Sequence, residues 1–529
     1  MKKIINSMKR YTFATILAGV VLAMSCTSSF DDINTNKNAL SNLGAAELPF
    51  LFSKAQQIAT HYVWTYQVAQ NLFADQYAQY FACTATYFPS DRLVIRQDWV
   101  GSAFNPIYTD VLPQLQTLFE NNDPSSAEYA IADIWWVYSF HRVTDYWGPI
   151  PYSKAGIPGS TVDYDPQDEI YSDFFTRLDN AISVLQTKTG TNAYGSFDLI
   201  YEGDVDNWIR FANTLKLRLA LRISKVEPAL AKTHGESAVA DGVMTTSPAH
   251  DALIERSLTG ADYNGLSVMS DWGEFRMSAA MESVLKGYDD PRMGIYFQPA
   301  KNNGEFNGLR NGLASSDLTL TINKADENSH VGERWTSVNI ALDGRPDHNA
   351  TPQNVMCSAE AWFLRAEGAL LGWNMGTTAQ AAYEAGIAAS MNQWGITDAG
   401  AINAYKTSLN TPVAPQDFLN SPPMTDIPVA YDAGDATVAL EQVMTQKWLA
   451  LYPEGMEAWA DYRRSKVLKL YPVAVSENSD ITNTTTQWLR RIPFLTSEKQ
   501  NNGPAVEAAV SLLGPGGDKV TTPLWWDKN

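Results

Sequence analysis

The residues that most suggest chemistry are aromatic side chains in predicted loops, each close to a group that forms hydrogen bonds. The chain contains 16 Trp, 24 Tyr and 20 Phe. A flat aromatic ring can stack on the C–H face of a sugar, while neighbouring amides, carboxylates or guanidinium groups bind the hydroxyls. The candidate ligand-binding residues are Tyr87, Phe88, Arg92, Trp99, Tyr263, Asn264, Trp272, Arg276 and Trp335. For each of them, packing inside the fold is the alternative interpretation.

The sequence contains none of the common catalytic motifs, so we predict that the protein is not an enzyme. Its six histidines are scattered, with no pair at metal-ligand spacing, and there is no G-x-S-x-G nucleophile elbow or phosphate-binding glycine loop. The stretch Asp289-Asp290-Pro291-Arg292 is interpreted as a turn held by an internal ion pair. Two carboxylates for glycoside hydrolysis need only meet in space, so a secreted glycosidase stays as an alternative. No cofactor is predicted, and a structural calcium ion is left open.

A lipid attachment site is predicted at Cys26. Four positive charges near the N-terminus precede an uncharged, mostly apolar run from Tyr11 to Met24. That run is too short for a membrane-spanning helix and has the length of a secretory signal. A cysteine at its end indicates cleavage before Cys26 and acylation, for example with palmitate. Ordinary signal cleavage that leaves a free cysteine is the alternative. We therefore expect a signal peptide at residues 1–25 and a lipid-anchored tether at residues 26–44.

Composition and charge exclude some partners. Hydrophobic residues make up 45% of the 529-residue chain and charged residues 18%, as in globular proteins. The net charge is −19, and loss of residues 1–25 removes four positive charges and no negative one. Such an acidic protein repels nucleic acid and anionic membrane surfaces, so electrostatic attraction does not hold it at a bilayer, whereas a lipid can. The remaining cysteines, Cys83 and Cys357, lie in apolar patterns that favour two buried thiols over a disulfide.

The candidate residues must be positioned by a mainly α-helical scaffold. Apolar residues recur at spacings of three and four, most clearly from Asp204 to Lys225. Two helices with a bend are expected between Ala45 and Phe81, followed by a loop from Thr84 to Gln97. Further helices are predicted at residues 125–142, from Asp165-Pro166 onward, and at 353–373, 377–394, 437–451 and 454–464. The predicted irregular parts are residues 257–351, residues 412–435 and the tail from Arg490.

The pair of helices at residues 353–373 and 377–394 forms a predicted antiparallel hairpin. Small residues on the first helix allow the second to approach closely. Hairpins of this size suggest tetratricopeptide-type stacking, although no strict 34-residue period is present. The expected architecture is a helical scaffold with a loop-rich insertion at about residues 257–351. Long loops on a rigid scaffold are common positions for binding sites.

Several of these stretches resemble the SusD/RagB family of outer-membrane lipoproteins. They are FDDINTNKNAL after the lipobox cysteine, RVTDYWGPIPYSKA, DLIYEGDVDNWIRFANTLKLRLALRIS, GYDDPRM, SAEAWFLRAEGALLGW with AAYEAGIAASMNQWG, QKWLALYPEGMEAWADYRRS, RRIPF and TTPLWWDK. They follow the family order over nearly the whole mature chain. Two departures are Lys37, where the family often has proline, and Ala23, where a lipobox usually has leucine.

The resemblance implies a mainly α, SusD-like domain at residues 45–529, with tetratricopeptide-type hairpins and a loop-rich ligand-binding region. It implies a protein anchored by lipid to the outer membrane and facing the cell exterior, with a SusC-like TonB-dependent transporter as partner. The expected ligand is an oligosaccharide, and oligopeptide capture and a purely structural repeat scaffold are the alternatives. By position, the loops Thr84–Trp99 and Tyr263–Arg276 are the candidates for ligand binding.

Overall fold

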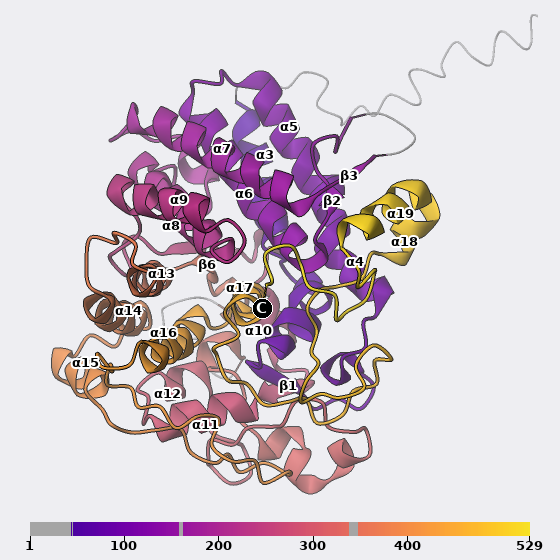
Figure 1. Ribbon diagram of the computed structural model, residues 1–529, viewed down its shortest axis with the longest axis vertical. Coiled ribbons are helices and arrows are strands. Elements are labelled where there is room, and N and C mark those ends of the chain that lie inside the picture. The colour runs from indigo at the N-terminus through magenta and orange to yellow at the C-terminus, as the bar shows by residue number, and fades with distance from the viewer. Residues whose placement is uncertain (1–43, 45, 158–161, 338–346, 529) are drawn as a thin grey trace, which may run out of the picture. The chain divides into compact units, whose positions relative to one another are not determined.

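The computed structural model describes residues 44, 46–157, 162–337 and 347–528, and these are mainly helical (Figure 1). The chain divides into two units, residues 1–48 and 49–529, and the second is described below. The expected signal peptide, Cys26 and all but the end of the expected tether lie outside the described residues. Within the described part, no helix has both the length and the apolar character that a membrane span requires.

One group of helices packs in chain order. It comprises α5 (Leu112–Asn121), α6 (Ala127–Trp147), α7 (Gln167–Gln186), α8 (Val205–Arg222) and α9 (Pro228–Asp241), each against the next. In Figure 1 they occupy the upper part of the picture. Helix–turn–helix units stacked in this way form the tetratricopeptide-type scaffold that the sequence predicted.

Local capping explains where several of these helices begin and end. The Ser126 side chain accepts a hydrogen bond from the Tyr129 amide at the start of α6. At the start of α8, the Asp204 carboxylate accepts hydrogen bonds from the amides of Asp206 and Asn207. Helix α6 ends at Gly148, whose φ of 87° is readily adopted only by glycine.

A second group of helices is joined to the first through α13 (Ser358–Leu370), which packs against α8. Helices α13 and α14 (Ala379–Gln393) form the predicted hairpin. Helix α16 (Ala436–Leu451) packs against both of them and also contacts α17 (Gly455–Ser465). The short helix α15 (Ala399–Lys406) lies beside α14.

The N-terminal aromatic segment forms two helical elements with a break, as predicted. They are α3 (Leu48–Ala59) and a π-helix, η1 (Gln67–Asp75). In the break, His61 and Val63 both have a φ of 52°. Strand β1 (Phe81–Cys83), the loop that follows it and α4 (Gln97–Pro106) complete this part of the chain.

The middle of the chain is built from short elements, as expected for a loop-rich insertion. They are α10 (Gly265–Ser270), β5 (Phe275–Met277), α11 (Ala279–Gly287), α12 (Met293–Tyr296) and several 3-10 turns. The predicted internal ion pair is confirmed: Arg292 and Asp290 are 2.6 Å apart and both side chains are fully buried. Cys83 and Cys357 are free and buried, as predicted.

The described residues contain three antiparallel strand pairs, two of which connect segments that are far apart in the sequence. The three pairs are β1 with β5, β2 (Ile150–Pro151) with β3 (Tyr164–Asp165), and β4 (Ala252–Ile254) with β6 (Gln353–Met356). The prediction of helix from residue 353 was wrong for the first five residues. Four of them form β6, because β4 supplies a pairing partner about one hundred residues away, and Cys357 precedes α13 in extended conformation. The tail also differs from the prediction, since it contains α18 (Thr496–Asn501) and α19 (Gly503–Leu512).

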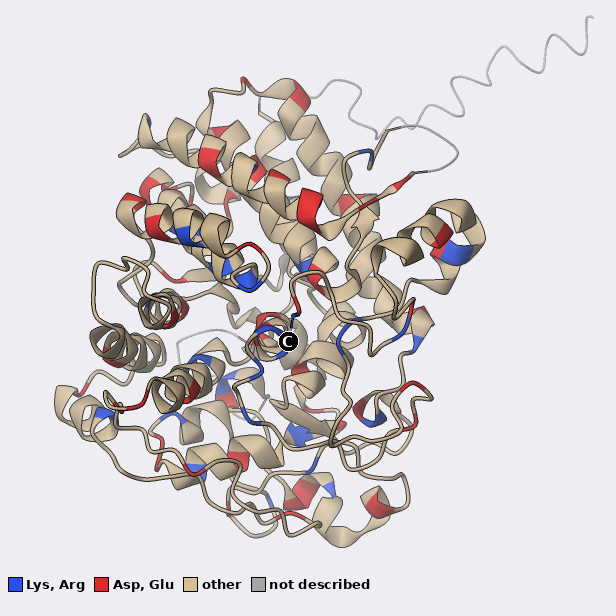
Figure 2. Ribbon diagram, in the orientation of Figure 1, with Lys and Arg blue, Asp and Glu red and all other residues tan. Residues whose placement is uncertain are grey.

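Buried ion pairs hold the second group of helices to α8. Arg218 donates two hydrogen bonds of 2.6 Å to the carboxylate of Glu360, which joins α8 to α13. Arg464 binds Glu367 through two bonds of 2.6 and 2.7 Å, which joins α17 to α13. Lys447 on α16 is 2.8 Å from the Asp461 carboxylate on α17. Figure 2 shows further charged residues on helices and loops throughout the molecule.

Candidate functional site

The pairing of β1 with β5 brings together the two loops that the sequence proposed for ligand binding. Ala82 lies opposite Arg276 and Cys83 opposite Phe275 in the antiparallel register. Directly after β1, the Thr84 amide donates to the Glu274 carbonyl at 2.9 Å, and the Thr84 hydroxyl donates to the Gly273 carbonyl at 2.6 Å. The segment after β1 therefore runs beside the segment before β5.

Glu274 connects three segments at this position. One oxygen of its carboxylate accepts a hydrogen bond of 2.6 Å from the Tyr87 hydroxyl. The other accepts a bond of 2.6 Å from the side-chain amide of Gln67, the first residue of η1. The hydrogen bond to Glu274 raises the pKa of Tyr87 to about 12, so the hydroxyl stays protonated and donates at neutral pH.

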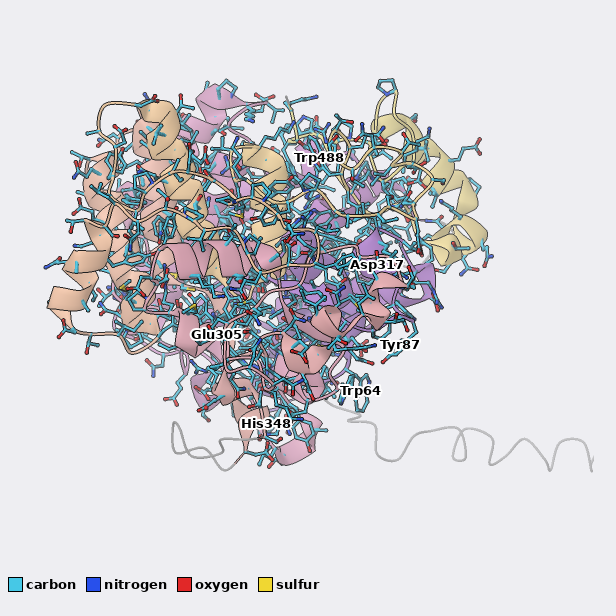
Figure 3. The ribbon with its side chains drawn as sticks, turned by 90° about the horizontal axis from the view of Figure 1, so that it is seen from below. Trp64, Tyr87, Glu305, Asp317, His348 and Trp488 are labelled. Carbon is cyan, nitrogen blue, oxygen red and sulfur yellow. The ribbon has the colours of Figure 1, made fainter. Side chains whose placement is uncertain are left out.

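Three exposed aromatic side chains belong to the segments that meet at this carboxylate. Trp64 precedes Gln67 by three residues, Tyr87 binds Glu274 directly, and Trp272 precedes Glu274 by two residues. Their exposed fractions are 67, 66 and 49%. Of the described aromatic residues, only Phe50 is similarly exposed elsewhere. We call Trp64, Tyr87 and Trp272 the aromatic platform, and Figure 3 shows Trp64 and Tyr87 pointing outward along one edge of the molecule.

The Trp64 segment is held by contacts on both sides of the exposed ring. The Val63 amide donates to the Tyr263 carbonyl at 3.0 Å. The Tyr66 hydroxyl donates to the buried Asp75 carboxylate at 2.7 Å. A Cβ added to Gly265 would lie 2.1 Å from the Tyr66 Cβ, so only glycine allows α10 this close to the segment. Trp64 is therefore displayed by a backbone that is fixed on either side.

Trp272 lies just beyond the end of α10. The Asn264 side chain caps α10 by accepting hydrogen bonds from the amides of Leu266 and Ser267. At the other end, the Trp272 amide donates to the Met269 carbonyl at 3.1 Å, and Gly273 turns the chain with a φ of 74°. The cap and the turn together fix the backbone on either side of Trp272.

A second row of rings continues from Tyr87. The Phe88 ring centroid is 4.6 Å from that of Tyr87 and 5.5 Å from that of Trp99, both in edge-to-face arrangement. The Arg96 guanidinium lies 4.4 Å from the Trp99 ring centroid. Phe88 and Trp99 are half-buried, so this row supports the loop that carries Tyr87 and extends its aromatic surface.

Four of the residues proposed from the sequence are buried. Arg92 pairs with Glu477 at 2.6 Å, and Asn264 caps α10. Arg276 donates to the Ala325 carbonyl at 2.9 Å, and burial lowers its pKa to about 10. Trp335 is 3% exposed and packs against Trp394. Because these four side chains are buried and bind other residues of the protein, they position the loops. Tyr263 is half-buried and contributes its backbone carbonyl.

Sequence reasoning missed Trp64, Gln67 and Glu274. Trp64 lies in an aromatic segment with helical spacing, where core packing was the expected role. The break that exposes it depends on positive φ values at His61 and Val63, and neither residue type signals such a conformation. Glu274 and Gln67 are 207 positions apart and meet only through the tertiary fold.

No cluster of three or more His, Cys, Asp or Glu residues suited to a metal ion occurs in the described part of the chain. The chemistry of the site consists of aromatic faces beside a carboxylate and an amide. Such a surface binds by stacking and hydrogen bonding.

The sequence and the fold are similar to those of known proteins. Residues 31–527 match the SusD-like family, described as SusD and RagB outer membrane lipoproteins. A chitin-binding SusD homologue from Flavobacterium johnsoniae is 36% identical, with a TM-score of 0.82 over 91% of this chain and 99% of that one. A SusD homologue from Bacteroides uniformis is 32% identical, with a TM-score of 0.81 over 92% and 100%. A SusD-like protein from Bacteroides thetaiotaomicron is 31% identical, with a TM-score of 0.80 over 91% and 99%. No curated protein matches the sequence.

Proposed function

Because this chain belongs to the SusD and RagB family of outer membrane lipoproteins, we propose that it captures a nutrient oligosaccharide at the cell surface. The aromatic platform is the proposed binding site. In this proposal the protein performs no chemistry on its ligand, and a SusC-like TonB-dependent transporter receives the captured oligomer.

The observation that carries the proposal is that three exposed aromatic side chains belong to segments that meet at one carboxylate, that of Glu274. Exposure of the apolar surface of Trp and Tyr side chains to water is unfavourable. A ligand that covers this surface therefore gains binding free energy. Sugar rings offer apolar C–H faces for such rings and hydroxyls for a carboxylate or an amide. Since Trp64, Tyr87 and Trp272 come from three separate segments, the platform suits several consecutive sugar rings better than a single one.

The ligand class follows from the comparison and from the charges at the platform. The Flavobacterium johnsoniae homologue is described as chitin-binding, so we propose a neutral β-linked oligosaccharide and take chitin oligomers as the first ligand to test. Glu274 disfavours anionic glycans, because its carboxylate joins the segments that carry the three rings and the whole chain carries a net charge of −19.

The platform is tested by measuring glycan affinity in single variants. Trp64→Ala and Trp272→Ala should each weaken binding of chitin oligomers by about tenfold or more, since burying an aromatic ring contributes about 1.5–3 kcal/mol. Isothermal titration calorimetry of the wild type and variants gives the dissociation constants. Phe50→Ala is the matched control, because Phe50 is also exposed but lies outside the platform.

Two results would contradict the platform. Equal effects of Phe50→Ala and Trp64→Ala would show that the loss is not specific to these rings. Binding of peptides but of no member of a glycan panel would replace the sugar with an oligopeptide ligand. Release of shortened glycans on incubation would instead favour a glycosidase.

Anchoring and partnership are separate proposals with their own tests. We propose that Cys26 carries the lipid, so Cys26→Ser should move the protein from the membrane fraction to the soluble fraction. We also propose that the wild type co-purifies with a TonB-dependent barrel protein from the outer membrane. Membrane association of Cys26→Ser at the wild-type level would place the anchor elsewhere in the chain.

A further inference from the structure

A cavity lies behind the loop that carries Tyr87, on the side away from the aromatic platform. It has a volume of about 140 Å³. Asp91 and Leu93 of that loop form one wall, and the C-terminal segment around Trp488 forms another. In Figure 3, Trp488 lies toward the edge of the molecule opposite Trp64 and Tyr87. The cavity and the platform are therefore distinct sites.

Two adjacent side chains of this cavity have unsatisfied polar groups. Both the oxygen and the nitrogen of the Gln76 side-chain amide lack a hydrogen-bond partner among the described residues, and so does the Tyr77 hydroxyl. Gln76 is 2% exposed and Tyr77 is 8% exposed. The nearby Gln79 differs, because its amide is fully engaged with the backbone of Tyr471. Buried polar groups of this kind need a partner, which water or a ligand must supply.

The mouth of the cavity is formed by Trp488 with Thr484, Thr485 and Gln487. Thr485 is exposed and the Trp488 side chain is half-buried. By contrast, the wall residue Trp459 is already covered on one face by the Arg463 guanidinium, 3.6 Å from its ring centroid. Trp488 has no aromatic or cationic partner of this kind within the described part of the chain. Its ring is therefore available to stack on a molecule that enters.

The size and charge of the cavity restrict what it can hold. A cavity of about 150 Å³ is known to admit a six-membered ring such as benzene. No Lys, Arg or His lines the walls, so an anionic group would find no counter-charge. The lining combines aromatic faces with amide and hydroxyl groups, and this combination matches a neutral ring that bears hydroxyls.

We propose that this cavity is a second binding site, which takes one neutral sugar ring in pyranose form. The Gln76 amide and the Tyr77 hydroxyl form hydrogen bonds with the sugar hydroxyls, and Trp488 covers the ring at the mouth. The site differs from the platform in taking a single ring instead of an oligomer, and it does not depend on the platform function.

Glucose and N-acetylglucosamine are the probes for this site, used as single sugars with the full-length protein. Calorimetry should detect binding, and soaked crystals should show the sugar beside Gln76. Tyr77→Phe removes only the unpartnered hydroxyl, and Trp488→Ala removes only the ring at the mouth. Each should weaken binding of the single sugar by about tenfold, the effect of one or two lost hydrogen bonds or of a lost stacking contact. Gln76→Leu should abolish it.

Platform variants separate this proposal from the first one. Trp64→Ala should leave binding of the single sugar unchanged while it weakens binding of oligomers. Loss of single-sugar binding in Trp64→Ala together with its retention in Gln76→Leu would place the sugar on the platform and overturn the proposal. Soaked crystals with ordered water only in the cavity would overturn it too. Circular dichroism shows whether each variant is folded, and Tyr77→Phe keeps the test valid if Gln76→Leu fails to fold.

Discussion

At the scale of single residues, burial changes the pKa of Asp75, whose carboxyl group binds Tyr66 next to the platform. Burial is the main cause that raises its pKa from 3.8 to about 7. In the unfolded chain the carboxyl loses its proton near pH 4, whereas in the folded protein it keeps the proton until about pH 7. The contribution of Asp75 to stability is therefore fully present below pH 4 and is lost as the pH rises through 7.

Asp75→Asn should remove this pH dependence. Relative to the wild type, the free energy of unfolding of the variant should rise between pH 4 and pH 8, by up to about 4 kcal/mol because each pKa unit corresponds to about 1.4 kcal/mol. Urea denaturation at a series of pH values measures the difference. Asp168→Asn is the control, since Asp168 is exposed at the start of α7. A difference in free energy of unfolding between Asp75→Asn and the wild type that does not change with pH would contradict the raised pKa of Asp75.

At the scale of elements, the close approach of α10 to the Trp64 segment decides whether the platform forms. A methyl group at position 265 would clash with Tyr66 and with the Val63 carbonyl. Gly265→Ala should therefore shift the segment, lower the free energy of unfolding by about 1–3 kcal/mol and weaken glycan binding. Thermal unfolding and calorimetry measure the two effects. Gly294→Ala should do neither, because no atom lies within 4 Å of a Cβ there, and equal effects at both positions would refute the role of this contact.

At the scale of the whole molecule, buried ion pairs fix the second group of helices to the first. Glu360→Gln removes the nearer charge partner of the buried Arg218 guanidinium and leaves only the Glu457 carboxylate, 3.6 Å away, so the free energy of unfolding should fall by up to about 3–5 kcal/mol. Denaturation by urea measures it. Asp163→Asn breaks the exposed pair with Lys154 and should change stability by less than about 1 kcal/mol. A small effect of Glu360→Gln would mean that the hydrophobic contacts alone hold these helices together.

The sequence by itself determined the helical scaffold, because periodicity and capping are local properties. The apolar stripe in α8 is an example, as is the hairpin of α13 and α14. It also indicated two loops of the proposed site, since aromatic residues beside turn-forming residues are visible in a single chain. Within those loops, Tyr87 and Trp272 are exposed, whereas Arg92 and Arg276 are buried with partners in the fold.

Only the tertiary structure decided which aromatic residues are displayed together. Burial depends on what packs against a side chain. The exposure of Trp64 depends on a backbone break and on α10, which follows about 200 residues later. Glu274 becomes the centre of the platform because β1 pairs with β5 across a similar separation. The cavity under Trp488 likewise needs Gln76 and the C-terminal segment to meet. Such contacts between distant parts of the chain leave no local pattern, because each partner is an ordinary residue in its own segment.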